Sequence, residues 1–120
     1  MNEPIGFKKK NPKNKIIKGN SDQEKHAIKL ETEGDFKQAE NIYRNIINDG
    51  TKEHSIYLRL ASLIFRRGDS LEVPKLIRKT IQLKPNCPEA YFILAMFYKK
   101  SENFKLAIVN LNKAIELKHD

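Results

Sequence analysis

The feature that most constrains the fold is a repeat: at a period of 34 residues, three segments that begin at Ser21, Ser55 and Glu89 align without gaps. Equivalent positions carry the same chemistry, because most columns are apolar and one marks a turn with glycine in two of the copies. A period of this length predicts stacked supersecondary units that share one continuous core. The matching columns are Ala27, Ala61 and Ala95; Leu30, Ile64 and Tyr98; Gly34, Gly68 and Glu102; Phe36, Ser70 and Phe104; Ala39, Val73 and Ala107; Tyr43, Ile77 and Leu111; and Ile46, Thr80 and Ala114.

Each segment is expected to form two α-helices joined in a hairpin. Apolar residues recur three and four apart on both sides of a short Gly-Asp or Glu-Asn turn, which is the spacing of one helix face. Pro88 suits the first helical turn, where its missing N–H is not needed. Pro74 stands one turn into its helix and predicts a delayed or bent start. The spacing predicts an all-α fold with helices near 22–33, 36–48, 54–67, 71–83, 88–100 and 104–117.

Nine consecutive apolar or aromatic residues, AYFILAMFY from Ala90 to Tyr98, are followed at once by Lys99 and Lys100. A membrane span needs about 20 apolar residues, so this run is expected to be buried or bound by protein. In a stack of hairpins, such a helix packs on its own partner and on the previous repeat and faces an inner groove. We therefore expect it to have hardly any side in contact with water.

The repeat resembles the tetratricopeptide repeat (TPR) family over about residues 21–120. The resemblance implies a right-handed α-solenoid of three helix-turn-helix hairpins, with repeats at about 21–53, 54–87 and 88–120. The third copy follows the family pattern most fully. The first copy carries Gln23 and His26 where a large aromatic residue and a leucine are usual, so its opening helix is expected to pack most loosely. Bacterial TPR proteins with short basic leads look similar, and in some of them the repeats precede a transferase domain.

The resemblance also implies a function, because TPR stacks present their first helices along a concave surface that binds peptide segments. This predicts an adaptor that binds a protein partner; the alternative is that these side chains only pack within the stack. Positions of the family's lysine and asparagine clamp for chaperone tails hold Glu24, Ile28, Glu89 and Ile93, so that binding mode is not expected. The predicted groove has an apolar middle and a basic rim and comprises Glu24, Ile28, Glu31, Leu58, Ser62, Phe65, Arg66, Phe92, Met96, Lys99 and Lys100.

The first 20 residues form a basic lead with six lysines and one glutamate, which account for most of the net charge of +8. Pro12, Gly19 and the lack of helical periodicity predict a flexible, disordered tail. Its charge favours nucleic acid or anionic lipid, whereas the alternatives are a solubilising extension or docking on the repeats. The second repeat adds a local excess of basic residues, and such a field favours acidic partners.

No residue pattern predicts an enzyme, a cofactor or a metal site. The chain has no glycine-rich phosphate loop, its only cysteine is Cys87, and His26, His54 and His119 fall in different columns of the repeat, so no catalytic set is brought together. The N-terminus lacks the apolar core of a signal peptide, and we therefore expect a cytoplasmic protein.

The last predicted helix is apolar over more than one stripe, although solenoids normally end in a polar capping helix. Three explanations remain open: a further domain follows, the tail covers this helix, or two copies meet through Ile108, Leu111 and Ile115. The rival functions are therefore a recruiting arm of a larger transferase-type enzyme, a nucleic-acid-associated protein and a self-associating module.

Overall fold

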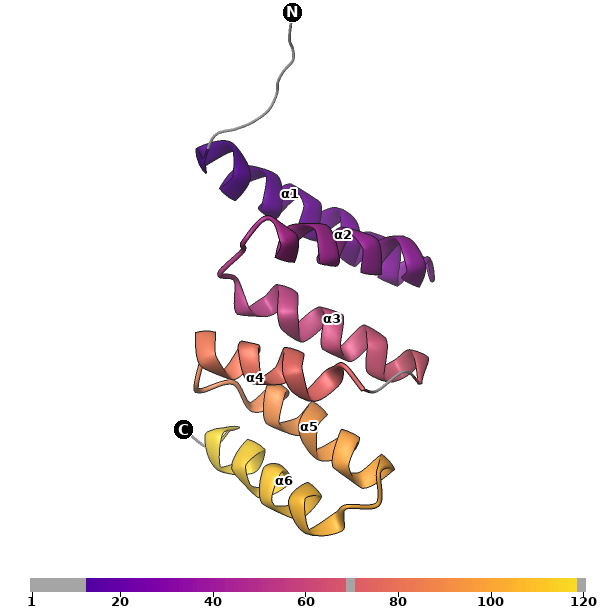
Figure 1. Ribbon diagram of the computed structural model, residues 1–120, viewed down its shortest axis with the longest axis vertical. Helices are drawn as coiled ribbons and strands as arrows, with labels where there is room; N and C mark the ends of the chain where they lie inside the picture. Colours follow the sequence, from indigo (N-terminus) through magenta and orange to yellow (C-terminus); the bar gives the residue numbers. More distant parts are fainter. Residues whose placement is uncertain (1–12, 69–70, 119–120) are drawn as a thin grey trace, which may run out of the picture. The chain divides into compact units, whose positions relative to one another are not determined.

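The computed structural model describes residues 13–68 and 71–118, with side chains from Asp22 onward. These residues contain six α-helices and no strand (Figure 1), as the spacing predicted. The chain divides into two compact units, Met1–Thr51 and Lys52–Asp120, and each is described by itself. The first unit contains α1 (Lys13–Thr32) and α2 (Phe36–Asn48); the second contains α3 (His54–Arg67), α4 (Val73–Leu83), α5 (Pro88–Lys100) and α6 (Phe104–Lys118).

Helix α1 begins at Lys13, nine residues before its predicted start. Residues 13–20, which we assigned to a disordered tail, therefore belong to a helix. Pro12 and Gly19 were interpreted as breakers, but a proline just before a helix is compatible with its start, and a glycine in a helix interior costs only about 1 kcal/mol. The rest of the predicted tail, residues 1–12, lies outside the described residues.

The delayed start of the second helix of repeat 2 is confirmed, because α4 begins at Val73 rather than at residue 71. Pro74 then falls in the first turn. Backbone N–H groups have no partner within the helix there, so a proline removes no helical hydrogen bond. Pro88 likewise opens α5.

The turn column has the same backbone conformation in all three repeats. Gly34, Gly68 and Glu102 have φ angles of 86°, 97° and 63°. In the first and third repeats the next residue donates its N–H back across the helix end, from Asp35 to the Leu30 carbonyl and from Asn103 to the Tyr98 carbonyl, both at 2.8 Å. This is the Schellman arrangement, which ends a helix by satisfying its last carbonyls. One turn geometry therefore recurs at the predicted period.

The first unit is a hairpin in which α1 contacts α2. Ala27, Ala39, Tyr43 and Ile46 are fully buried. The Tyr43 hydroxyl donates a hydrogen bond to the Glu31 carboxylate across the hairpin, which satisfies a polar group that would otherwise be costly to bury. Ala27 is the one buried residue of α1 from Asp22 onward, whereas α3 buries six, in keeping with the loose packing expected of the first helix.

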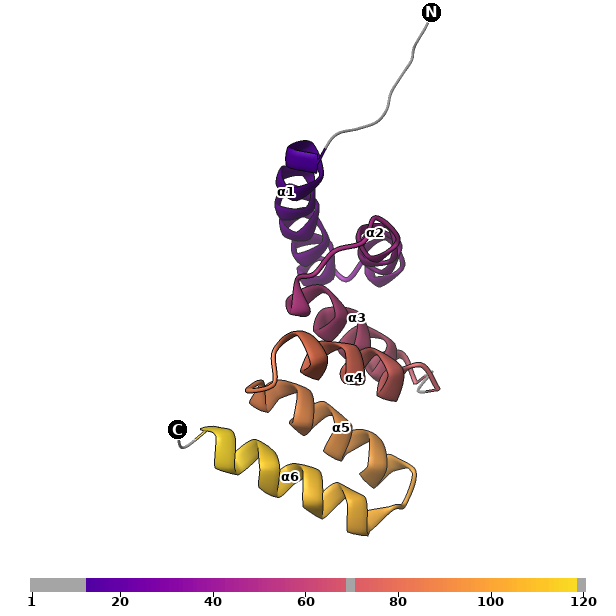
Figure 2. The same ribbon diagram turned by 60° about the vertical axis from the view of Figure 1, so that its left-hand side comes forward.

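The second unit contains two hairpins in contact with each other. Helix α3 pairs with α4, α5 pairs with α6, and α5 also contacts α3 and α4 (Figures 1 and 2). The alanine column lies in the core, since Ala61 and Ala95 are fully buried. Small residues let neighbouring helix axes approach to about 8–10 Å. The core also holds Ile56, Leu60, Ile64, Val73, Ile77 and Ala90.

Helix α5 is more exposed to solvent than its apolar composition predicted. It does contact three other helices, yet its only fully buried residues are Ala90 and Ala95, and Phe92 is 50% exposed. The large side chains of the apolar run are only partly covered by their neighbours. The open part of this surface lies in a groove.

Candidate functional site

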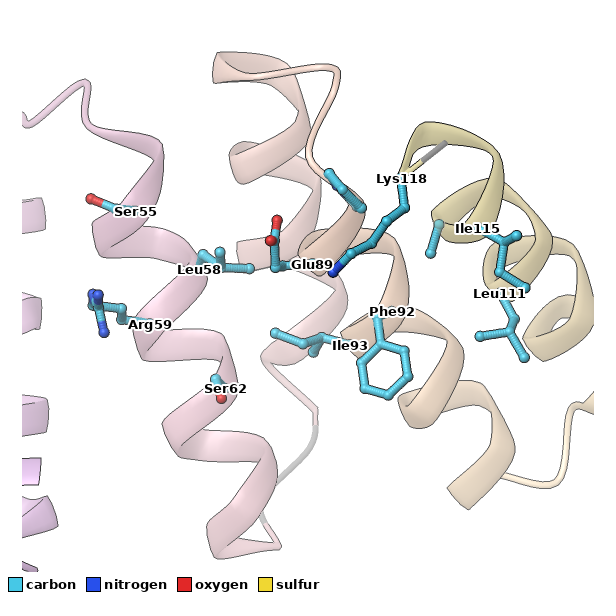
Figure 3. Close-up of a pocket in the computed structure, with 12 residues that line it drawn as sticks. Ser55, Leu58, Arg59, Ser62, Glu89, Phe92, Ile93, Leu111, Ile115 and Lys118 are labelled. Atoms are coloured by element: carbon cyan, nitrogen blue, oxygen red, sulfur yellow. The ribbon is translucent and has the colours of Figure 1, made fainter. Parts of the chain in front are cut away.

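Helices α3, α5 and α6 line an open groove of about 820 Å³ within the second unit (Figure 3). This volume falls in the usual range for protein ligand sites, about 300–1,000 Å³. The residues that line the groove are Ser55, Leu58, Arg59 and Ser62 from α3; Pro88, Glu89, Phe92 and Ile93 from α5; and Leu111, Ala114, Ile115 and Lys118 from α6.

The repeat itself builds two walls of the groove. The α3 residues recur at intervals of three and four, so they share one helix face. Three of the four α5 residues are equivalents of α3 residues one period later: Glu89 corresponds to Ser55, Phe92 to Leu58 and Ile93 to Arg59. Equivalent columns of two successive first helices therefore face one groove.

The third wall, from α6, was not part of the predicted groove. Leu111, Ala114, Ile115 and Lys118 follow the same three-and-four spacing. We had assigned Leu111 and Ile115 to a self-association face together with Ile108. In the structure those two side chains line the groove, whereas Ile108 does not line it and is 59% exposed.

The groove is mainly apolar, with charge at a few positions. Leu58, Phe92, Ile93, Leu111 and Ile115 supply apolar surface. Phe92 and Ile115 are 50% and 49% exposed, so each has substantial area left to bury. Among the charged lining residues, Arg59 lies on α3, Glu89 on α5 and Lys118 on α6, and Lys118 extends toward α5 in Figure 3.

Some of the predicted groove residues lie further along the same two helices. Leu58, Ser62 and Phe92 line the groove; Phe65 and Arg66 on α3, and Met96, Lys99 and Lys100 on α5, do not. The Lys100 Nζ lies 5.6 Å from the centre of the Phe65 ring, a cation–π distance, so the last turns of α3 and α5 are neighbours. Arg66, Lys99 and Lys100 are exposed; we call these three residues the basic end.

The α1 residues of the predicted groove belong to the first unit. Glu24, Ile28 and Glu31 are half-buried, and Glu31 accepts the hydrogen bond from Tyr43. Its carboxylate is thus engaged within its own hairpin. That these residues contribute to a binding surface stays a prediction.

Sequence reasoning missed the remaining lining residues, and for α3 and α5 the repeat held the information. The predicted groove omits Glu89 and Ile93, although both stand in clamp columns, which the family resemblance places on the concave face. Arg59 shares the column of Ile93. The groove position of Lys118 had no counterpart in the family pattern that we used.

Reactive chemistry is not evident in the groove. The Cys87 thiol, just before α5, is 1% exposed and its Sγ lies 3.7 Å from a Glu89 carboxylate oxygen. Burial raises the pKa of this thiol, which keeps it in the unreactive protonated form. Among the described residues, no three His, Cys, Asp or Glu side chains gather closely enough to hold a metal ion.

Comparisons with known proteins agree with the helical geometry. A family model described as "Tetratricopeptide repeat" matches residues 88–120, which are the predicted third repeat. The chain is similar to the crystal structure of MamA, with a TM-score of 0.77 and 18% identity, over 83% of this chain and 58% of that one. It is also 27% identical over 85 residues to protein O-mannosyl-transferase TMTC1 from Homo sapiens.

The chain spans only part of each of these proteins, about a tenth of TMTC1 and just over half of the MamA chain. The aligned part of TMTC1 covers 71% of this chain. None of the described helices has both the length and the apolar character that crossing a bilayer requires.

Proposed function

Since the chain is a tetratricopeptide-repeat protein, we propose that it acts as a protein-interaction module and that the groove of its second unit binds an apolar segment of a partner protein. In this role the chain supplies binding and positioning and carries out no chemistry of its own. A cytoplasmic location stays a prediction.

The observation that carries this proposal is the half-exposed aromatic side chain of Phe92 inside a mainly apolar groove. Full burial of one large apolar side chain is worth about 1.5–3 kcal/mol, and interface energy concentrates in a few such anchors. Phe92 and Ile115 project from two helices that contact each other, which favours a pocket for one partner side chain rather than a flat surface.

The test is selection from a random library of 12-residue peptides displayed on phage, with the whole chain as bait. We expect wild-type protein to enrich peptides that contain a bulky apolar residue, and Phe92→Ala to lose them. Phe104→Ala is a matched control, because Phe104 is 57% exposed and lies outside the groove. Circular dichroism verifies that both variants remain helical. If Phe92→Ala enriches the same peptides as wild type, the groove is not the binding site.

The similarity to a transferase supports a second candidate, in which this repeat region recruits a protein to a larger enzyme. The matched part is a tenth of that transferase, so the resemblance covers only a small part of the enzyme. Sequencing the complete reading frame in the source genome tests this candidate, since a recruiting arm requires a catalytic domain in the same chain.

A nucleic-acid role has one favourable observation, which is the outer face of α4. This face exposes three basic side chains, Lys75, Arg78 and Lys79, and α4 contains no acidic residue. Binding of a 20-nucleotide single-stranded RNA should then weaken steeply with added salt. Removal of residues 1–12, or Lys75→Glu with Lys79→Glu, should each weaken it further; unchanged binding argues against this role.

Self-association through α6 is supported by the exposure of Phe104, Ile108 and Ile115, which with Leu111 follow the four-three-four spacing of a helix-packing seam. Light scattering over a range of concentrations tests it. Ile108→Glu should abolish a dimer, whereas Val109→Glu should not, because Val109 is 58% exposed but points away from the seam. A monomer at every concentration contradicts the proposal.

A further inference from the structure

We infer that the partner segment is an extended, acidic peptide: its apolar side chain occupies the groove beside Phe92, and its carboxylates lie at the basic end formed by Arg66, Lys99 and Lys100. This inference rests on the proposed function and specifies the chemistry of the ligand.

The groove and the basic end lie along one continuous face of α3 and α5. On α3 the series Ser55, Leu58, Ser62, Phe65 advances by three or four residues at each step, which keeps the side chains on one face. The corresponding α5 series is given by Glu89, Phe92, Met96, Lys99. The Lys100 Nζ lies 5.6 Å from the centre of the Phe65 ring, so the two helices remain neighbours at this end. A ligand chain that leaves the groove along α5 therefore passes the three cations.

Charge along this face is uneven: one carboxylate, Glu89, lies in the groove beside Arg59 and Lys118, whereas the basic end contains three cations. Helix α3 contains no acidic residue, and the single acidic residue of α5 is Glu89, in its first turn at the groove. Basic residues stand in the last turns of both helices, at Arg66 and Lys99 among others. The second unit as a whole has 13 Lys and Arg against 7 Asp and Glu. Because the one carboxylate of α3 and α5 lies at the groove, an acidic ligand places its own carboxylates at the basic end and away from Glu89.

The spacing between anchor and charges follows from helix geometry. Lys99 and Lys100 come seven and eight residues after Phe92, so they are displaced by about 11–12 Å along α5 at 1.5 Å per residue. An extended peptide covers about 3.3 Å per residue. Its acidic residues should therefore stand three or four positions from the apolar anchor, whereas a helical ligand would need about eight.

The apolar groove distinguishes a peptide from a nucleic acid. Phosphates would account for the cations, but nucleobases are planar rings with polar edges, whereas the aliphatic Leu58 and Ile115 line this groove beside Phe92. Arginine and lysine both bind carboxylates, and arginine does so with two parallel N–H donors. An acidic peptide with one apolar side chain binds both parts of the face, because that side chain fills the groove and its carboxylates pair with the basic end.

The test uses the same 12-residue phage library and the whole chain. We expect sequences enriched by wild type to carry Asp or Glu three or four positions to one side of a bulky apolar residue. Arg66→Glu with Lys100→Glu should lose these sequences. Arg67→Glu with Lys105→Glu is the matched control, since it makes the same change of charge at exposed positions off this face. Replacing the acidic residues of a selected peptide by Asn or Gln should weaken binding about tenfold, as expected for two or three partly exposed ion pairs.

The outcomes separate this inference from the function on which it rests. Peptides that require Phe92 but show no acidic excess overturn the inference and leave the groove function intact. If the acidic residues stand about eight positions from the apolar anchor, the ligand is helical and the inferred extended conformation is wrong. If no peptide depends on Phe92, the proposed function itself fails. If a single-stranded RNA binds the wild type and is lost from Arg66→Glu with Lys100→Glu while no peptide is enriched, the basic end recognises nucleic acid instead.

Discussion

Three equivalent residues, Gly34, Gly68 and Glu102, adopt a left-handed backbone at the turn of each hairpin. This conformation costs an L-residue about 1–2 kcal/mol. Glycine avoids that cost, but its larger loss of chain entropy on folding cancels part of the advantage. We expect Glu102→Gly to raise the free energy of unfolding by about 0.5–1 kcal/mol, measured as a shift of the urea midpoint. Gly34→Ala should lower it by a similar amount, because a Cβ at Gly34 meets nothing within 4 Å and only the backbone term changes. A destabilised Glu102→Gly protein would contradict this account.

The buried thiol of Cys87 predicts a pH dependence. Burial raises the pKa of Cys87 above its ordinary value of 9.0, so above that pH the unfolded thiol is ionised while the folded thiol keeps its proton. Unfolding then releases a proton, and stability falls as pH rises. Urea unfolding between pH 8 and pH 10.5 should show a steeper loss for wild type than for Cys87→Ala. Burial also raises the pKa of Tyr57, but that contribution is common to both proteins. Equal slopes would show that Cys87 ionises normally in the fold.

At the scale of one helix, the alanine column limits how closely helices approach. Ala95 of α5 is fully buried, whereas Ala107 of α6 is only partly buried. Ala95→Leu should destabilise the protein by about 1–3 kcal/mol, because added methylene groups in a packed core force the helices apart. Ala107→Leu adds the same side chain and should cost less. Thermal unfolding followed by circular dichroism compares the two, and equal losses would remove the special role of the column.

The sequence predicted five of the six helices closely because apolar spacing defines a helix face and turn residues mark its ends. Pro74 is one such turn residue: its missing N–H is tolerated only in the first turn, which excludes an earlier start of α4. The start of α1 at Lys13 was missed for the opposite reason. Before Ser21 the first helix lies outside the three aligned segments, and its lysines were interpreted as a tail. Periodicity carries no information where the repeat does not extend.

The groove was predictable where it depends on repeat columns and unpredictable where it depends on packing between helices. Leu58 and Phe92 were found because they are equivalent positions on two first helices. Leu111 and Ile115 of α6 were assigned to another surface, since the direction of a wide apolar face cannot be read from spacing alone. The way α6 packs against α5 decides that those two residues reach the groove.

At the scale of the whole molecule, the division after Thr51 makes the location of binding testable. Every residue that lines the groove, and every residue of the basic end, lies between Ser55 and Lys118. Contacts in repeat proteins are local, and each repeat depends mainly on its neighbours. We therefore expect a fragment of residues 52–120 to be helical by circular dichroism and to bind a selected peptide with a Kd within about threefold of the whole chain, a difference of less than 1 kcal/mol.

The same experiment decides whether α1 contributes to binding. If the helical fragment binds at least about tenfold more weakly, a loss of about 1.4 kcal/mol, then the first unit supplies contacts, and Glu24 and Ile28 are the first residues to replace in the whole chain. Glu31 is a poorer choice because its carboxylate already accepts the hydrogen bond of Tyr43, so its substitution would also leave a buried hydroxyl without that partner. A fragment that binds as tightly as the whole chain restricts the site to α3, α5 and α6, and the predicted extension of the groove onto α1 is then wrong.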